Sequence, residues 1–256
     1  MLKTGNYILL IILFISAFLF ADTQQEIEVG VDEKLGEYIP LELEFVNSHG
    51  DTVSLEKVIH EQPTLLALVY YECPGICSPL LTELAWVVDR VDLTPEEDFQ
   101  VVTISFDHSE DYKVAANWKK NYLHGIKREF PESAWNFLTG DSLTINKLTE
   151  SVGFRFKKQG DEFLHAGTLI TIAPDGKISR YLFGDTYNQF DVKMALLDAE
   201  SGKTSPTIAK VLQFCFSYDP EGRGYTLNLT RIIGSVMLIF VAGFFGILTL
   251  RKNKKN

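Results

Sequence analysis

The chain has few cysteines and few basic residues, and each shortage excludes a class of protein. It contains 3 Cys among 256 residues, too few for a fold held together by disulfides. Its 24 Lys and Arg against 34 Asp and Glu give a formal net charge of −10. An acidic chain is a poor partner for nucleic acid, because the phosphate backbone attracts clustered positive charge. No internal repeat is present, which excludes a solenoid.

Long apolar runs are present instead, one at each end of the chain. Lys3 precedes the apolar run 7–20, and this order is typical of a secretory signal. Cleavage after residue 21 and retention as an anchor both remain open. The run 232–250 carries no charge and is long enough to cross a hydrocarbon core of about 30 Å. A basic cluster in Arg251–Asn256 follows it at once, and such clusters favour the cytoplasmic side.

These ends predict four segments. Residues 1–21 form a signal peptide or N-terminal anchor, 22–226 an extracytoplasmic domain, 227–250 a transmembrane helix and 251–256 a cytoplasmic basic tail. The main domain is therefore expected on the periplasmic side of the cytoplasmic membrane. Because that compartment is oxidising, a thiol pair in it needs a metal or a thiol reductant to stay reduced.

Two of the cysteines, Cys73 and Cys77, lie close together between a predicted strand and a predicted helix. The apolar run 65–69 before them indicates a buried strand, and the apolar period in 80–88 indicates a helix. A helix N-terminus stabilises anions, so a thiolate there has a lowered pKa and becomes a good nucleophile or metal ligand. The third cysteine, Cys215, lies in an aromatic-flanked stretch and is predicted to be a small buried hydrophobic residue.

The rest of the domain alternates strands and helices and ends in a hairpin around the turn 174–177. This pattern predicts an α/β fold, a thioredoxin-like mixed sheet flanked by helices. The expected strands are 41–46, 63–71, 99–106, 135–138, 154–158, 168–173 and 178–183. The expected helices are 54–58, 78–91, 111–122, a helix capped by Ser142 that runs to about 152, 190–200 and 206–216, and residues 219–224 are a linker.

The thiol pair allows either redox chemistry or the binding of a soft metal. Soft thiolates select Cu(I) and Zn(II), and a low-coordinate Cu(I) site needs one more donor. The candidate is His165, because the start of the following strand can return to the edge of the sheet that carries the cysteines. Spacing alone favours an ordinary loop histidine. The other histidines, His49, His60, His108 and His124, lie in no comparable motif.

The chain resembles the Sco/SenC family of thioredoxin-like copper-handling proteins, in the branch with a C-terminal membrane anchor. The resemblance covers roughly residues 35–225. It rests on an ordered set of motifs: the strand 65–71, Cys73 and Cys77, the segments 101–107 and 137–141, His165, and the turn 174–178. The chain departs from many members in having Gly75 after the first Cys-Pro, Ser78 after the second Cys and His108 after Asp107.

The resemblance implies a function and a ligand set. Members bind one copper through the two cysteines and the late histidine, here Cys73, Cys77 and His165. They assist assembly of the copper A centre in subunit II of cytochrome c oxidase, by delivering copper, by reducing the target's cysteine pair, or both. The expected partners are this subunit or a similar copper acceptor, a thiol reductant and the membrane. Asp107 then either tunes the site electrostatically or is an ordinary loop carboxylate.

Three functions remain open from the sequence. The first is a membrane-tethered copper chaperone. The second is an enzyme, a thiol-disulfide reductase in which Cys73 attacks a partner's disulfide and Cys77 resolves the product. The third is a sensor that signals through the membrane, and the short tail 251–256 argues against it.

Overall fold

The computed structural model describes residues 29–59, 61–73, 75, 77–160, 162–184, 186–205, 216–219, 224–227 and 237, with backbone alone for 77, 216–219 and 224–227. The predicted signal, almost all of the predicted membrane span and Cys215 lie outside these residues. Within the part of the chain that the structure describes, no helix is both long and apolar enough to cross a membrane.

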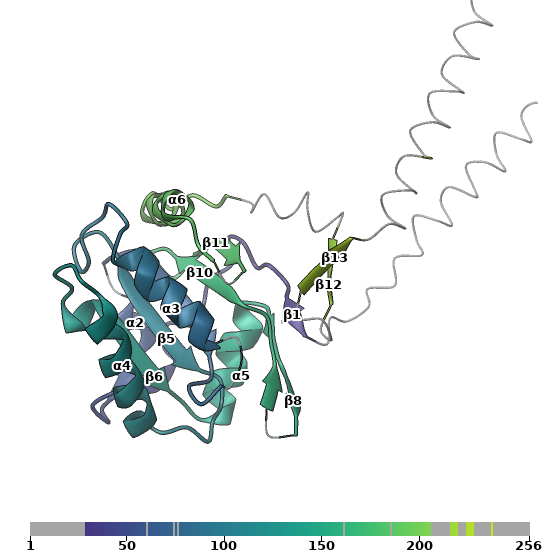
Figure 1. The fold of residues 1–256 in the computed structure, drawn as a ribbon, viewed down its shortest axis with the longest axis horizontal. Coiled ribbons are helices and arrows are strands. Elements are labelled where there is room, and N and C mark those ends of the chain that lie inside the picture. Colours follow the sequence, from purple (N-terminus) through teal and green to yellow (C-terminus); the bar gives the residue numbers. More distant parts are fainter. Residues whose placement is uncertain are drawn as a thin grey trace, which may run out of the picture.

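The elements alternate along the chain as the sequence predicts (Figure 1). The strands are β1 (Gly30–Val31), β2 (Glu44–Asn47), β3 (Thr52–Ser54), β4 (Thr64–Val69), β5 (Gln100–Ser105), β6 (Trp135–Thr139), β7 (Phe154–Arg155), β8 (Lys157–Gln159), β9 (Glu162–Leu164), β10 (Thr168–Ile172), β11 (Ile178–Phe183), β12 (Phe216–Asp219) and β13 (Gly224–Leu227). The helices are α2 (Leu55–Val58), α3 (Cys77–Val88), α4 (Tyr112–Gly125), the 3-10 turn η1 (Glu132–Ala134), α5 (Ser142–Ser151) and α6 (Gln189–Glu200).

The main sheet is mixed, which confirms the predicted fold class. Its strand order is β11-β10-β4-β5-β6-β2-β3. The central strands β4, β5 and β6 are parallel, and β10 and β11 run antiparallel beside β4 as the predicted hairpin. Every residue of β4 and β5 is buried, as expected for parallel strands covered on both faces.

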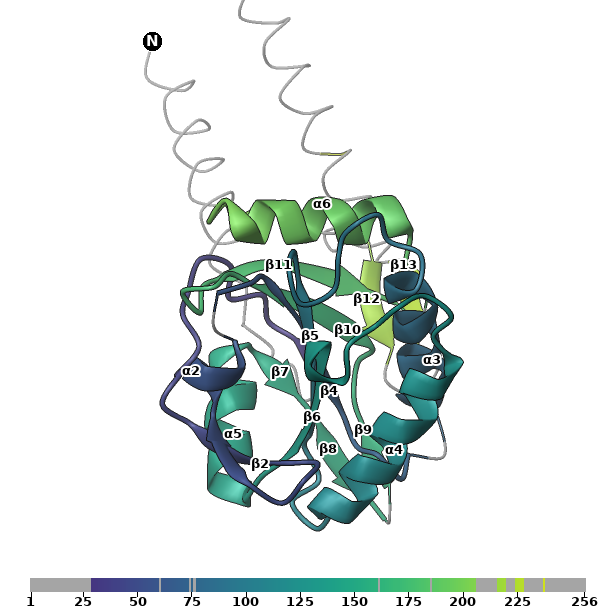
Figure 2. The ribbon, with the colours of Figure 1, turned by 90° about the vertical axis from the view of Figure 1, so that its left-hand side faces the viewer.

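Helices cover both faces of this sheet. Helices α3 and α4 lie together on one face, and α5 lies on the other (Figure 2). Helix α6 packs against α3, β10 and β11. The core between these layers contains large side chains with less than 2% exposure, among them Trp135, Tyr71 and Tyr181. This packing holds the carboxyl ends of β4 and β5 in fixed positions, and the candidate site lies at those ends.

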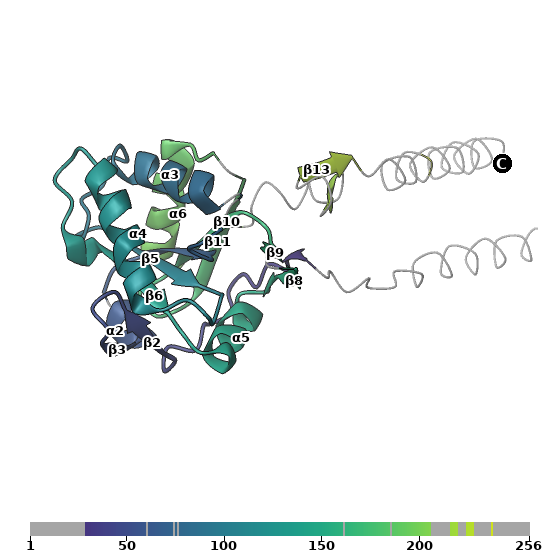
Figure 3. The ribbon, with the colours of Figure 1, turned by 60° about the horizontal axis from the view of Figure 1, so that its bottom comes forward.

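Three local predictions were wrong. The cap of α5 is Asp141 rather than Ser142, because the Asp141 carboxylate accepts hydrogen bonds from the N–H groups of Leu143 and Thr144 at 2.8 and 2.9 Å. The predicted strand 154–158 is split between β7, which pairs with β1, and β8, which pairs with β9. The β8–β9 hairpin stands beside β1, outside the main sheet (Figure 3).

The third error concerns the C-terminal part of the domain. Phe216, predicted to end a helix, is the first residue of β12, and β12 pairs antiparallel with β13. The predicted linker 219–224 therefore includes the ends of two paired strands. The remaining residues of the predicted helix, 206–215, lie outside the described part of the chain.

Candidate metal and thiol site

Cys73 lies in a tight turn that directly follows β4. The Cys73 N–H donates to the carbonyl oxygen of Tyr70 at 3.3 Å and closes the turn. The side chain is 8% exposed. The Gly75 N–H donates to the Cys73 sulfur at 3.3 Å. Because a hydrogen bond to the charged form of a group favours that form, this contact stabilises a thiolate at Cys73.

Cys77 is the first residue of α3. The sequence predicted a helix beginning at Ser78, so the structure moves its start by one residue onto the second cysteine. The positive end of the helix dipole favours negative charge in the first turn, which suits a thiolate at this position.

The structure brings His165 next to the turn that carries Cys73. His165 lies between β9 and β10, and β10 pairs antiparallel with β4, with Leu169 opposite Ala67. The residues before β10 therefore lie at the edge of the sheet where β4 ends. The rings of His165 and Tyr70 are 5.8 Å apart between centroids, and Tyr70 is the first residue of the Cys73 turn.

His165 is enclosed by aromatic rings and is 5% exposed. Its ring centroid lies 5.1 Å from that of Phe106 and 6.2 Å from that of Phe154. Its Nδ1 lies 3.1 Å from the carbonyl oxygen of Ala166. A carbonyl only accepts, so this hydrogen bond requires the proton on Nδ1 and leaves the lone pair of the neutral ring on Nε2. A neutral imidazole oriented in this way is the usual form of a metal-ligating histidine.

The aromatic shell extends from His165 to the β8–β9 hairpin. The rings of Phe106 and Phe156 stack at 4.6 Å, and Phe163 packs against both Tyr70 and Phe106 at 5.2 and 5.6 Å. The Phe163 N–H lies 3.5 Å from the Tyr70 hydroxyl oxygen, which accepts from it. Apolar rings lower the local dielectric and so strengthen any charge interaction at this edge of the sheet.

A buried carboxylate at the same edge, Glu110, was missed by the sequence analysis. It accepts hydrogen bonds from the N–H groups of Tyr71 and Glu72 at 2.8 and 2.7 Å and from the Ser105 hydroxyl at 2.5 Å. Burial raises the pKa of Glu110, and the negative charge of Asp107 raises it further, although the three hydrogen bonds act to lower it. Nothing in the sequence separates Glu110 from an exposed loop carboxylate, since it lies among polar residues between a strand and a helix.

Within the described part of the chain, the remaining polar candidates make no contact with Cys73 or His165 that the structure records. Asp107 accepts hydrogen bonds from the Ser109 N–H and hydroxyl at 2.9 and 2.6 Å, as a loop-capping carboxylate does, and its negative charge also acts on Glu110. His49, His108 and His124 are exposed, and His60 lies outside the described residues.

A complete metal-binding set of side chains is not contained in the described part of the chain. No group of three or more His, Cys, Asp and Glu side chains there is arranged to hold a metal ion. The described donors are the sulfur of Cys73 and the imidazole of His165, which lie at one edge of the sheet. Both are donor types that Cu(I) accepts, so the chemistry of these two residues fits a soft metal.

Comparison with known proteins points to one family. The sequence profile of SCO1/SenC matches residues 32–196, which is more than half of the chain. A protein of Stutzerimonas stutzeri, provisionally described as copper-binding, is 25% identical over 146 residues, which are 55% of this chain and 67% of the relative.

Solved structures share the fold. One, provisionally described as an electron transfer protein from Aquifex aeolicus, is 27% identical, with a TM-score of 0.60 over 66% of this chain and 95% of its own. Arabidopsis thaliana ScoI, solved with copper bound, is 18% identical, with a TM-score of 0.52 over 64% and 97% of the two chains, and supports the fold alone. The profile match over most of the described domain shows that the chain belongs to the SCO1/SenC family.

Proposed function

We propose that this protein is a copper chaperone that binds one copper through Cys73, Cys77 and His165. It assists assembly of the copper A centre in subunit II of cytochrome c oxidase or in a similar copper acceptor. Membership of the SCO1/SenC family supports this function. The observation that carries it is the placement of His165 beside the Cys73 turn, with the ring 5.8 Å from that of Tyr70.

The donor chemistry supports copper as the cargo. Two thiolates and an imidazole form a soft, three-coordinate set of the kind that suits Cu(I). Thiolates bind only when deprotonated, and the Gly75 N–H and the start of α3 both favour the deprotonated form. The Ala166 carbonyl accepts a hydrogen bond from Nδ1, so a neutral His165 ring has its lone pair on Nε2, the nitrogen that would bind copper. The buried aromatic rings around His165 shield this side of the site from water.

The proposal includes a membrane tether. Residues 1–21 act as a signal peptide or anchor, residues 227–250 span the cytoplasmic membrane, and the tail 251–256 stays in the cytoplasm. The domain 22–226 then faces the periplasm. The uncharged run 232–250 and the basic cluster after it support this orientation.

A second function, thiol-disulfide reduction, is favoured by one contact, the hydrogen bond from Gly75 to the Cys73 sulfur. In that reaction the Cys73 thiolate attacks a partner's disulfide, forms a mixed disulfide and releases one partner thiolate. The Cys77 thiolate then attacks the Cys73 sulfur and releases the second. Two electrons pass to the partner, the chain is left with a disulfide, and a thiol reductant regenerates the pair.

Copper binding by the full chain in mild detergent separates these functions. The reduced protein is compared with a Cys73→Ser/Cys77→Ser double variant, with His165→Ala, and with the control His124→Ala on the exposed side of α4. A chaperone retains about one copper per chain, and the sample loaded with Cu(II) shows a sulfur-to-Cu(II) charge-transfer band, as expected for thiolate ligation. The double variant loses both, His165→Ala binds more weakly, and His124→Ala matches wild type.

Two results would contradict parts of the proposal, the first the chaperone itself and the second its three-donor ligand set. Wild type that retains no copper, yet cycles readily between dithiol and disulfide, is a reductase. If His165→Ala binds copper as tightly as wild type, His165 is not a copper ligand.

A further inference from the structure

A buried carboxylate, Glu110, binds the turn that carries the first cysteine. The Tyr70–Cys73 turn has two central peptide N–H groups, those of Tyr71 and Glu72. Both donate to the Glu110 carboxylate, at 2.8 Å to Oε2 and 2.7 Å to Oε1. Each oxygen therefore holds one peptide unit of the turn, and the next residue along the chain is Cys73.

Glu110 is itself fixed from the neighbouring strand. Ser105, the last residue of β5, donates its hydroxyl to Glu110 Oε2 at 2.5 Å, and the same hydroxyl oxygen accepts the Asp107 N–H at 3.1 Å. Glu110 is 8% exposed and Ser105 is fully buried. The carboxylate therefore joins the ends of the two adjacent parallel strands β4 and β5, and a movement of one turn is transmitted to the other.

The two backbone contacts require an accepting oxygen at each branch of the Glu110 side chain. The Tyr71 N–H points at Oε2 and the Glu72 N–H at Oε1, so both oxygens must accept. Glutamine has the same shape but one oxygen, and its NH₂ group would face a backbone N–H. A buried donor left without an acceptor is unfavourable, so the turn would rearrange.

We propose that Glu110 is a positioning residue that fixes the Cys73 turn and thereby sets the copper affinity of the site. The inference rests on the proposed function for its copper readout. Its second readout, the accessibility of the Cys73 thiol, needs no metal. A carboxylate that only stabilised the fold would change neither quantity at a temperature where the protein stays folded.

The matched control is Asp89. Its carboxylate also accepts two consecutive backbone N–H groups, those of Lys127 and Arg128 at 2.7 and 2.9 Å, both on Oδ1 and at the far end of α3. Glu110→Gln and Asp89→Asn both replace a carboxylate by an amide, one beside Cys73 and one remote from it. Asparagine can keep both backbone contacts on its one oxygen, whereas glutamine must lose one of the two at Glu110.

The test uses the full, reduced, metal-free chain in detergent. The alkylation rate of Cys73 by iodoacetamide is followed by mass spectrometry of its peptide, and Cu(I) affinity is measured by competition with a chromogenic chelator. Glu110→Gln is expected to raise the alkylation rate several-fold. It should weaken Cu(I) binding about tenfold, the lower end of the loss caused by removing a residue that orients metal ligands. Asp89→Asn is expected to lower the melting temperature and to leave both readouts unchanged.

Each outcome decides the inference. Glu110→Gln with wild-type alkylation and affinity overturns it, and so does Asp89→Asn shifting both readouts equally. If the wild-type protein binds no copper, the proposed chaperone function is wrong. The alkylation rate of Cys73 then tests the positioning role of Glu110 without the copper readout. If Glu110→Gln does not fold, Ser105→Ala replaces it. This milder variant should shift both readouts in the same direction by less, and wild-type behaviour in it overturns the inference.

Discussion

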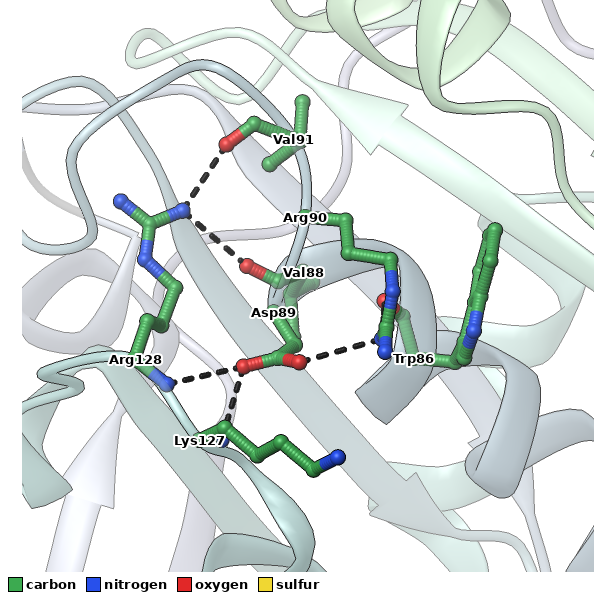
Figure 4. A network of polar contacts seen from close by, with 7 residues as sticks. All are labelled: Trp86, Val88, Asp89, Arg90, Val91, Lys127 and Arg128. Carbon is green, nitrogen blue, oxygen red and sulfur yellow. Dashed lines mark hydrogen bonds and ion pairs between the residues drawn. The ribbon is translucent and has the colours of Figure 1, made fainter.

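Two carboxylates in this molecule each accept two consecutive backbone N–H groups, in opposite electrostatic settings. Asp89 follows the C-terminal end of α3, where it accepts the N–H groups of Lys127 and Arg128 and an N–H of the Arg90 side chain (Figure 4). Glu110 accepts the N–H groups of Tyr71 and Glu72 at the Cys73 turn. Each carboxylate holds two consecutive peptide units.

The charges around the two groups differ. Burial alone would raise the pKa of Asp89, but the N–H groups of Arg128 and Lys127 and the positive charges of Arg90 and Lys127 outweigh it and lower the pKa. Burial raises the pKa of Glu110, and the negative charge of Asp107 adds to that effect.

The two shifts have opposite consequences for stability. The lowered pKa of Asp89 means that its ionised form stabilises the fold above the ordinary pKa of aspartate, and this contribution is lost as pH falls through the folded value. The raised pKa of Glu110 means that its contribution is present below the ordinary pKa of glutamate and is lost as pH rises through the folded value. Ionisation of Asp89 thus stabilises the scaffold, whereas ionisation of Glu110, at the Cys73 turn, lowers stability.

The largest expected effect comes from removing the cation that holds the Asp89 end of α3. Arg128 donates through its guanidinium to the carbonyl oxygens of Val88, Val91 and Leu93 at 3.2, 2.8 and 2.8 Å. Arg128→Ala should lower the free energy of unfolding by about 3 kcal/mol, because each of the three hydrogen bonds contributes about 1 kcal/mol when the side chain is partly exposed.

Urea unfolding of the metal-free chain measures this loss. Lys127→Ala is the control, since the Lys127 N–H that binds Asp89 belongs to the backbone and survives the change. The Cys73 alkylation rate should stay at the wild-type value. A faster alkylation rate in Arg128→Ala would contradict the separation of the two carboxylate sites. It would show that a change at the C-terminal end of α3 alters the Cys73 turn at its N-terminal end.

A smaller loss is expected from Asp89→Asn. The variant keeps one oxygen and loses the charge that attracts Arg90 and Lys127, so the free energy of unfolding should fall by about 1–2 kcal/mol at neutral pH. Because the pKa of Asp89 is lowered, the difference from wild type should shrink as pH falls through that value. Urea titrations at several acidic pH values check this. If the difference in unfolding free energy between wild type and Asp89→Asn does not vary with pH, the loss comes from the changed side-chain geometry and not from the lost charge.

The smallest expected effect is the opposite pH trend at Glu110. Wild type should gain stability relative to Glu110→Gln as pH falls from neutral toward the ordinary pKa of glutamate, because the raised pKa favours the protonated native state. Asp107 and the buried Tyr71 face this group and do not change in the variant. Parallel urea titrations of the two proteins give the difference in unfolding free energy. If wild type instead gains stability relative to Glu110→Gln as pH rises, the direction of the Glu110 pKa shift is wrong.

The sequence predicted the parts of the fold that depend on local pattern. The apolar strands 63–71 and 99–106 correspond to β4 and β5, because fully buried strands have a distinctive composition. The placement of His165 beside the Cys73 turn follows from the antiparallel return of β10 along β4. That placement agrees with the predicted ligand set, and ligation itself stays a prediction.

The missed features depend on contacts between distant segments. The break between β7 and β8 falls at Phe156, whose ring stacks on Phe106 of a different strand end. Glu110 is buried only because the turns after β4 and β5 fold against each other. Neither contact produces a local periodicity in the sequence. Residue propensity and motif spacing alone therefore could not predict them.

The antiparallel placement of β10 against β4 also determines when the site can form during folding. His165 reaches the Cys73 turn through this pairing, which joins segments separated by β5, β6 and their connecting helices. Closing so long a loop is entropically unfavourable until the intervening sheet exists, and contacts of high sequence separation form late. An incompletely folded chain therefore presents two thiols without the histidine, and the proposed three-donor site arises only together with the finished sheet.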